Sequence, residues 1–127
     1  MTATAKYQIF YMLPSFFRDG SMGADWLREH GRLPTLATIH TTHALLVDGL
    51  TFPFDCSRDK ALERVFCSMQ AERWSPNGEA RELIRSKGLE HTSMSVGDII
   101  AEIDGNWGQL YIVDRFGFAP IGEAFRA

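Results

Sequence analysis

The feature that most constrains the fold is a pair of short strand-like runs near the C-terminal end. Residues 98–103 and 110–113 are rich in isoleucine, leucine, valine and tyrosine, and the glycine-containing segment 104–108 separates them. Runs of this length, joined by a short loop with glycine, are typical of a β-hairpin. The sequence therefore predicts a C-terminal β-hairpin, followed by a last segment that Gly117 and Pro120 interrupt.

The N-terminal part of the chain predicts one strand and one short helix. Residues 6–13 carry the aromatic and branched side chains that are typical of a strand. Pro14 is expected to end this strand, because proline cannot donate to a β-ladder. Residues 15–21 are then expected to form a loop, and Ser21 is a suitable N-cap for a short helix that runs to His30.

The next expected element is extended. Residues 35–47 are rich in threonine, isoleucine and valine, whose β-branched side chains favour a strand. Asp48 and Gly49 then form a strong turn signal. Residues 50–54 are aromatic but contain Pro53, which predicts a packed loop or a sheet edge.

Two further helices are expected in the middle of the chain. Residues 58–70 place apolar side chains at i, i+3, i+4 and i+7, which lie on one helical face: Leu62, Val65, Phe66 and Met69. Ser57 is the expected N-cap of this helix. The second helix is expected to start at Ser75–Pro76, with proline at its first position, and to end at Gly88.

These elements follow one another in the order β-α-β-α-α-β-β. That order predicts an α+β fold with a small, mainly antiparallel sheet, helices packed on one face of it, and the C-terminal β-hairpin. The chain has 127 residues, a length typical of one domain, here residues 1–127.

Composition narrows the protein class. Hydrophobic residues make up 45% of the chain, which excludes general disorder, and the formal net charge of -3 argues against a general polyanion binder. The longest apolar runs have about four residues, whereas a membrane span needs about 20. The N-terminal segment lacks the pattern of a secretory signal, and the cysteines, Cys56 and Cys67, are expected to be free thiols. The expected location is therefore the cytoplasm.

The segment from His91 to Asp98 is the densest polar stretch. One interpretation is catalytic: Ser93 or Ser95 as nucleophile, His91 as base and Asp98 as its orienting carboxylate, with Asp114 nearby in a small hydrolase or nuclease. The other is structural, because serine and threonine side chains satisfy backbone groups at loop-to-strand junctions.

The structural interpretation makes a numerical prediction. Gly97 is expected to adopt a backbone angle that a β-carbon would forbid, and Asp98 is expected to accept backbone hydrogen bonds at the entry of the strand. Loss of a local cap of this kind in Asp98→Ala would cost about 1–2 kcal/mol.

Two other groups of polar residues bear on metal binding and on nucleic-acid binding. His40 and His43 lie in the expected strand 35–47, where residues three apart point to opposite faces, so no metal site is expected. No cofactor is expected either. A basic cluster with a neighbouring tryptophan is a candidate nucleic-acid surface, although glutamates interleave with it: Arg73, Trp74, Arg81, Arg85 and Lys87.

Aromatic residues are abundant, at 12% of the chain. Most are expected in the core, but four lie in expected loops and are predicted to be exposed: Phe16, Phe17, Trp74 and Trp107. Exposed aromatic side chains are typical anchors for a protein partner.

The final third of the chain resembles the YodL-like domain. Residues 93–100, Ser-Met-Ser-Val-Gly-Asp-Ile-Ile, and residues 111–118, Tyr-Ile-Val-Asp-Arg-Phe-Gly-Phe, are similar to the two motifs of that family. Residues 7–11 with Arg18–Asp19 are similar to its opening strand and Arg-Asp pair, and residues 62–66 match its central helix loosely. The likeness is specific over residues 93–118.

The chain departs from the family pattern at two places. Many members carry histidine directly before the Ser-x-Ser motif, where this chain has Thr92 and places His91 one position earlier, and its segment 74–88 is longer than usual. The resemblance implies a small accessory or interaction protein of a plasmid, phage or other bacterial mobile element, and no catalytic residues.

The leading hypothesis is therefore a non-enzymatic module that binds a host or element protein, as an inhibitor of host defence or a regulator of transfer. The expected contact residues are Arg18, Asp19, Trp74, Trp107, Asp114 and Arg115. The small hydrolase and the nucleic-acid-binding module remain as alternatives.

Overall fold

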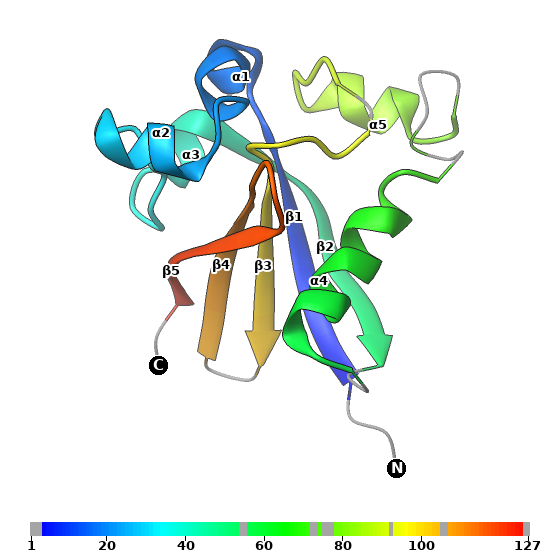
Figure 1. The fold of residues 1–127 in the computed structure, drawn as a ribbon. Coiled ribbons are helices and arrows are strands. Elements are labelled where there is room, and N and C mark those ends of the chain that lie inside the picture. Colours follow the sequence, from blue (N-terminus) through cyan, green and yellow to red (C-terminus); the bar gives the residue numbers. More distant parts are fainter. Residues whose placement is uncertain are drawn as a thin grey trace.

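The computed structural model describes residues 4–53, 56–71, 74, 78–91, 93–104 and 107–125. Within these residues the chain forms a five-stranded antiparallel sheet with the strand order β2-β1-β3-β4-β5 (Figure 1). The elements are β1 (Thr4–Met12), α1 (Pro14–Gly20), α2 (Ala24–Glu29), α3 (Ile39–Thr42), β2 (His43–Pro53), α4 (Arg58–Ser68), α5 (Arg81–Ser86), β3 (Ile99–Asp104), β4 (Trp107–Val113) and β5 (Phe118–Phe125).

The α+β class, the antiparallel sheet and the C-terminal hairpin predicted from the sequence are confirmed. The two strand-like runs become β3 and β4, which pair from Ile99–Ile112 to Asp104–Trp107. The last segment forms β5 and pairs with β4 in a second hairpin. The expected helix 58–70 is α4, and the side chain of Ser57 caps it by accepting the backbone N–H of Lys60.

Two predictions in the N-terminal part are wrong. Residues 15–20, expected within the loop 15–21, belong to α1, because Pro14 occupies the first helical turn, where its fixed φ and missing N–H suit a helix start. Ser21 consequently follows the end of α1, and α2 begins only after Gly23, whose φ is 99°.

The expected strand 35–47 is also only partly correct. Ile39–Thr42 form α3, and the strand begins at His43. Asp48–Gly49 does not turn the chain: β2 continues to Pro53, and the register skips Gly49 between the Tyr7–Leu50 and Gln8–Asp48 pairs. A glycine with φ of 82° here accommodates a β-bulge in place of the expected turn.

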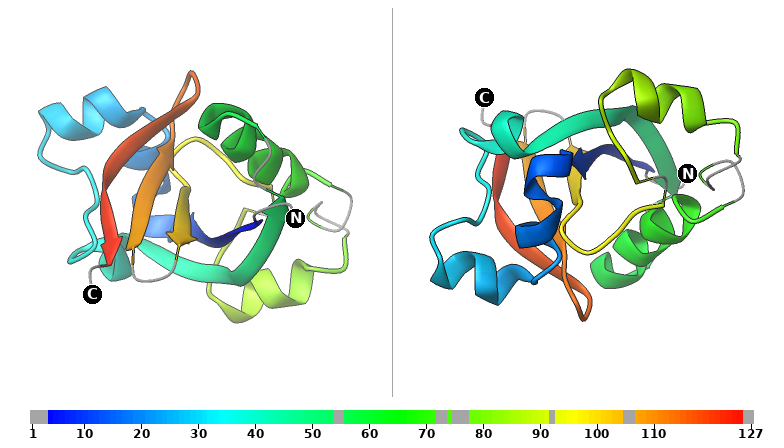
Figure 2. Two further views of the ribbon diagram at one scale, coloured as in Figure 1. Left: turned by 90° about the horizontal axis from the view of Figure 1, so that it is seen from below. Right: turned by 90° about the horizontal axis from the view of Figure 1, so that it is seen from above.

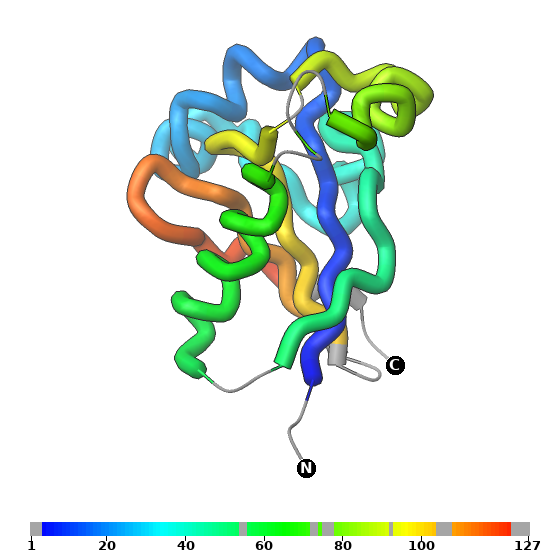
Figure 3. Tube along the Cα trace, turned by 90° about the vertical axis from the view of Figure 1, so that its right-hand side faces the viewer, coloured from blue at the N-terminus to red at the C-terminus, as the bar shows by residue number. Residues whose placement is uncertain are grey.

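The helices divide between the two faces of the sheet, where the sequence indicated one (Figure 2, and from the side in Figure 3). One core cluster joins Tyr7, Ile9 and Tyr11 of β1 to α4, α5 and the segment between them. The other joins Met12 and the opposite face of β3 and β4 to α1, α2 and α3. Strands β3 and β4 have buried apolar residues on both faces, as in Ile99–Ala101 and Leu110–Val113, so both faces need cover.

Candidate functional site

Asp98 lies fully buried, with 0% exposure, just before β3, and it joins three segments of the chain. Its Oδ1 accepts the backbone N–H of Met12 at 2.8 Å, and its Oδ2 accepts the backbone N–H of Ser95 at 2.8 Å. The Nε2 atom of His91 lies 2.9 Å from Oδ1 and 2.8 Å from Oδ2. The carboxylate therefore holds the end of β1 and the segment 91–95 against the start of β3.

The environment of this pair is largely apolar. The His91 ring stacks on Tyr11, with ring centroids 4.5 Å apart, and meets Phe17 edge-on at 5.1 Å. Burial raises the pKa of the Asp98 carboxyl, and the hydrogen bonds from His91, Met12 and Ser95 counter part of that shift. Because both carboxylate oxygens already accept backbone N–H groups, we assign the Nε2 proton to His91.

The loop before Asp98 makes a second buried contact, with His43. This side chain is 3% exposed, and its Nε2 donates to the carbonyl of Gly97 at 2.7 Å. Burial lowers the pKa of His43 to about 4, so the ring is neutral near pH 7. The φ of Gly97 is 101°, and a β-carbon there would lie 2.7 Å from the carbonyl oxygen of Gly20, so only glycine fits.

The residues proposed for nucleophilic chemistry do not assemble as that hypothesis requires. Ser95 offers Asp98 its backbone N–H, and its hydroxyl donates instead to the carbonyl of Ser93 at 3.2 Å. Asp114 has other partners, described below. Among the described residues only His91 and Asp98 of this set meet through their side chains, whereas the chemistry needs at least three to converge. The structural role predicted for this segment accounts for its contacts.

Asp114 follows β4 and caps α2. Its Oδ1 accepts the backbone N–H of Ala24, the first residue of α2, at 3.1 Å, and that of Arg115 at 2.8 Å. A β-carbon at Gly23 would lie 3.1 Å from this oxygen, so a glycine next to the helix leaves room for the carboxylate. Asp114 therefore fastens the β4–β5 turn, residues 114–117, to α2.

This contact predicts a modest loss of stability in Asp114→Ala. A missing N-terminal cap costs about 1 kcal/mol of unfolding free energy, which urea denaturation followed by circular dichroism would measure. Asp114→Asn keeps the accepting oxygen and is the matched control, expected to retain most of the wild-type stability. Equal stability of Asp114→Ala and the wild type would contradict the cap.

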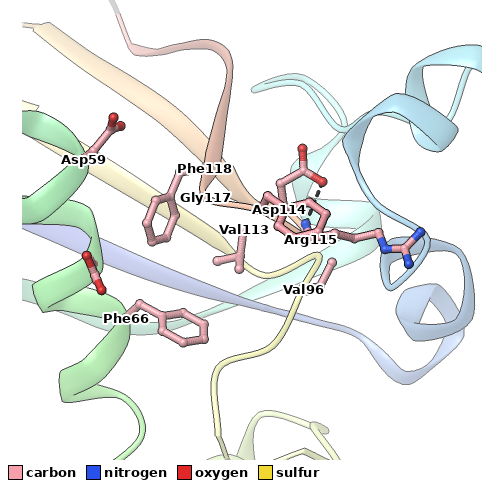
Figure 4. A pocket seen from close by; sticks show the side chains of 10 residues that line it. Asp59, Phe66, Val96, Val113, Asp114, Arg115, Gly117 and Phe118 are labelled. Atoms are coloured by element: carbon pink, nitrogen blue, oxygen red, sulfur yellow. Dashed lines mark hydrogen bonds between the residues drawn. The ribbon is translucent and has the colours of Figure 1, made fainter.

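The β4–β5 turn projects between α2 and α4, as both views of Figure 2 show. Phe116 at this turn is 94% exposed. A hollow of about 630 Å³ lies between the turn and α4 (Figure 4) and is here called the α4 hollow. A second, of about 610 Å³, lies between the turn and α2 and is called the α2 hollow. Both are lined by Asp114, Arg115 and Phe116.

The other expected contact residues have different surroundings. Asp19 forms an ion pair with Arg32 at 3.1 Å, and Arg18 lies exposed in the last turn of α1. The side chain of Trp107 lies outside the described part of the chain.

The predicted exposure of Phe16 and Trp74 is wrong. Phe16 is 2% exposed and Trp74 is 8% exposed, because segments outside the sheet supply the large rings that cover its two faces. Phe17, at 38%, is exposed as predicted. Trp74 is therefore unsuited to be a surface anchor.

The buried Trp74 also removes the stacking ring of the candidate nucleic-acid surface. The basic residues of that surface that the structure describes are exposed: Arg81, Arg85 and Lys87. Arg81 lies 3.7 Å from the carboxylate of Glu82. The fourth, Arg73, lies outside the described residues.

Two features were missed by the sequence reasoning. The first is the exposed Phe116: residues 111–118 resemble one continuous strand, although the polar residues before Phe116 and Gly117 after it are typical of a turn.

The second is Glu102, on β3, which is buried and accepts a hydrogen bond from Arg58 of α4 at 2.9 Å. The Nε atom of Arg58 lies 2.8 Å from the other oxygen of Glu102. Burial, together with the Glu102 carboxylate, raises the pKa of Tyr7 to about 12. No local pattern links Glu102 to a partner 44 positions away.

Comparisons with family models, curated proteins and solved structures find no match to this chain. In the described residues, no helix has the length and apolar character needed to cross a membrane. The same residues contain no group of three or more histidine, cysteine or acidic side chains placed to hold a metal ion.

Proposed function

We propose that this chain is a small protein-interaction module that binds its partner through the β4–β5 turn. The observation that carries the proposal is Phe116, which is 94% exposed in a turn that Asp114 fastens to α2. Large aromatic side chains that fill a pocket of the partner contribute a large share of binding energy. Exposure of an apolar ring to water is unfavourable, so its burial against a partner lowers the free energy.

The turn is firmly positioned for such a role. Asp114 ties its first residue to α2, and the carbonyl of Gly117 accepts the backbone N–H of Asp114 at 3.0 Å. A preformed turn loses little conformational entropy on binding. The two hollows beside it leave space for side chains of a partner on either side of Phe116.

The partner class follows from the resemblance to the YodL-like domain, which implies a host protein or another protein of the mobile element. An inhibitor of host defence and a regulator of transfer both act by such binding and need no catalytic residue. Of the contact residues expected from the sequence, Asp114 and Arg115 belong to this surface, and the cytoplasm is the proposed site of action.

The test is to locate the partner contact on the chain. We expect a photo-crosslinking phenylalanine analogue at position 116 to capture a partner from host extract, and the same analogue at position 36 to capture none. Leu36 is the matched control because it is a 50% exposed apolar side chain in another segment. Equal capture at both positions would contradict the assignment of the turn.

Once a partner has been identified, its affinity measures the contribution of Phe116 directly. An aromatic anchor contributes about 2 kcal/mol or more, so Phe116→Ala is expected to weaken binding about 30-fold in calorimetry. Leu36→Ala is expected to leave the dissociation constant unchanged. The stability of Phe116→Ala should stay within about 0.5 kcal/mol of the wild type, because the ring makes little contact in the free protein.

A further inference from the structure

The two hollows beside the β4–β5 turn share an arrangement of carboxylates. In the α4 hollow, Asp59 and Glu63 stand one helical turn apart on α4. In the α2 hollow, Asp25 and Glu29 stand one helical turn apart on α2. Residues four apart lie on the same side of a helix, so each pair is directed to one side of the turn that carries Phe116.

The two pairs differ in how far cations of the same chain compensate them. Among the described residues, Asp59, Glu63 and Glu29 form no ion pair, while Asp25 pairs with Arg28 at 3.0 Å. Like charges four apart on a helix repel, and a cation placed between them relieves that repulsion.

The cation that lines both hollows is Arg115, and it does not balance the α4 hollow. Figure 4 shows its guanidinium directed away from α4, toward the other side of the turn. The guanidinium therefore lies on the side of the α2 hollow, and Asp59 and Glu63 of the α4 hollow are left without it.

The apolar part of the α4 hollow fits a long cationic side chain. Phe66 and Phe118 meet edge-on in this hollow with ring centroids 6.3 Å apart, and Figure 4 shows both rings lining it. In the α2 hollow, by contrast, the Trp26 ring is already stacked on His30, with ring centroids 3.9 Å apart. Lysine and arginine combine an apolar stem with a charged head, and aromatic faces attract their cations. An acidic rim over an aromatic lining matches both parts of such a side chain.

We propose that the partner presents a basic segment that crosses the β4–β5 turn and places an arginine or lysine side chain in the α4 hollow, beside Phe116. This inference rests on the proposed function and names the chemistry of the partner at that surface. A nucleic acid is the wrong occupant, because its phosphates would meet the carboxylates of Asp59 and Glu63.

The test is an unbiased selection of displayed random peptides on the wild-type protein, followed by affinity measurement of the enriched peptides. We expect them to carry arginine or lysine beside an apolar residue and to bind more weakly as salt increases. The doubly neutralised variant Asp59→Asn/Glu63→Gln is expected to weaken binding about tenfold. Asp25→Asn/Glu29→Gln is expected to have a smaller effect, because Arg28 and Arg115 already lie at the α2 hollow. Glu79→Gln/Glu82→Gln removes the same charge beside and on α5, and it is the matched control, expected to change nothing.

The outcomes separate the inference from the proposed function. Peptides that require Phe116 but are neutral or acidic, or that bind Asp59→Asn/Glu63→Gln as tightly as the wild type, would overturn the basic partner while the interaction surface stands. Free arginine or spermine binding as tightly as the peptides would also overturn it, in favour of a small cation. Enriched peptides that bind Phe116→Ala as well as the wild type, or no enrichment at all, would overturn both proposals.

Discussion

Replacing Asp98 with alanine is expected to lower the free energy of unfolding by about 3–5 kcal/mol, which is the cost of breaking a buried, fully hydrogen-bonded charge cluster. The change leaves the backbone N–H groups of Met12 and Ser95 and the Nε2 proton of His91 without their acceptor. Each buried donor without a partner costs about 1–3 kcal/mol. The expected loss therefore exceeds the 1–2 kcal/mol predicted from the sequence, because that prediction counted a single local cap.

Urea denaturation of the variant, followed by circular dichroism, measures this loss. Asp48→Ala is the matched control: Asp48 is exposed, and it accepts a surface hydrogen bond from Gln8, so its change should fall within about 0.5 kcal/mol. Should Asp98→Ala not fold, Asp98→Asn provides a milder removal of the charge. A loss of only 1 kcal/mol in Asp98→Ala would show that the cluster of His91, Met12 and Ser95 contributes little.

The second large effect is expected on acidification. The folded-state pKa of His43 is lowered to about 4, against about 6.5 in an unfolded chain, because burial disfavours the charged ring. The unfolded state therefore binds the proton more readily. The stabilisation is fully present above pH 6.5 and is lost progressively as the pH falls toward 4. At about 1.4 kcal/mol for each pKa unit, the loss amounts to about 3 kcal/mol.

The measured quantity is the difference in unfolding free energy between the wild type and His43→Gln from pH 7 to pH 4.5. Taking the difference isolates His43 from other groups, including Asp98, whose raised pKa acts in the opposite direction. We expect the wild type to lose stability more steeply than the variant across this range. Parallel curves would contradict a neutral, buried His43.

The helix α4 shows which parts of the fold can be predicted from local pattern. Its apolar spacing, from Leu62 to Met69, and its cap at Ser57 depend on residues within one or two helical turns. Strands β3 and β4 were predictable for the same reason, since a short loop joins them. Residues 15–21 and 35–42 were mispredicted because their helices are short and rest on packing against the second core cluster.

The candidate site shows the same division. The motif around Asp98 could be recognised in the sequence. Its contact with Met12 could not be predicted, because the two residues lie 86 positions apart. The exposure of Phe116 and the burial of Trp74 depend on which faces the helices cover. Residue type alone assigns an aromatic side chain to neither the core nor the surface.

The sequence by itself determined the α+β class, the helix α4 and the C-terminal hairpin, because each depends on residues that are close together in the chain. The tertiary structure decided that Asp98 is the centre of a buried hydrogen-bonded cluster, and that Phe116 stands exposed between the α2 and α4 hollows. Both outcomes depend on contacts between segments far apart in sequence, where burial and the meeting of separate hydrogen-bonding groups set the free energy.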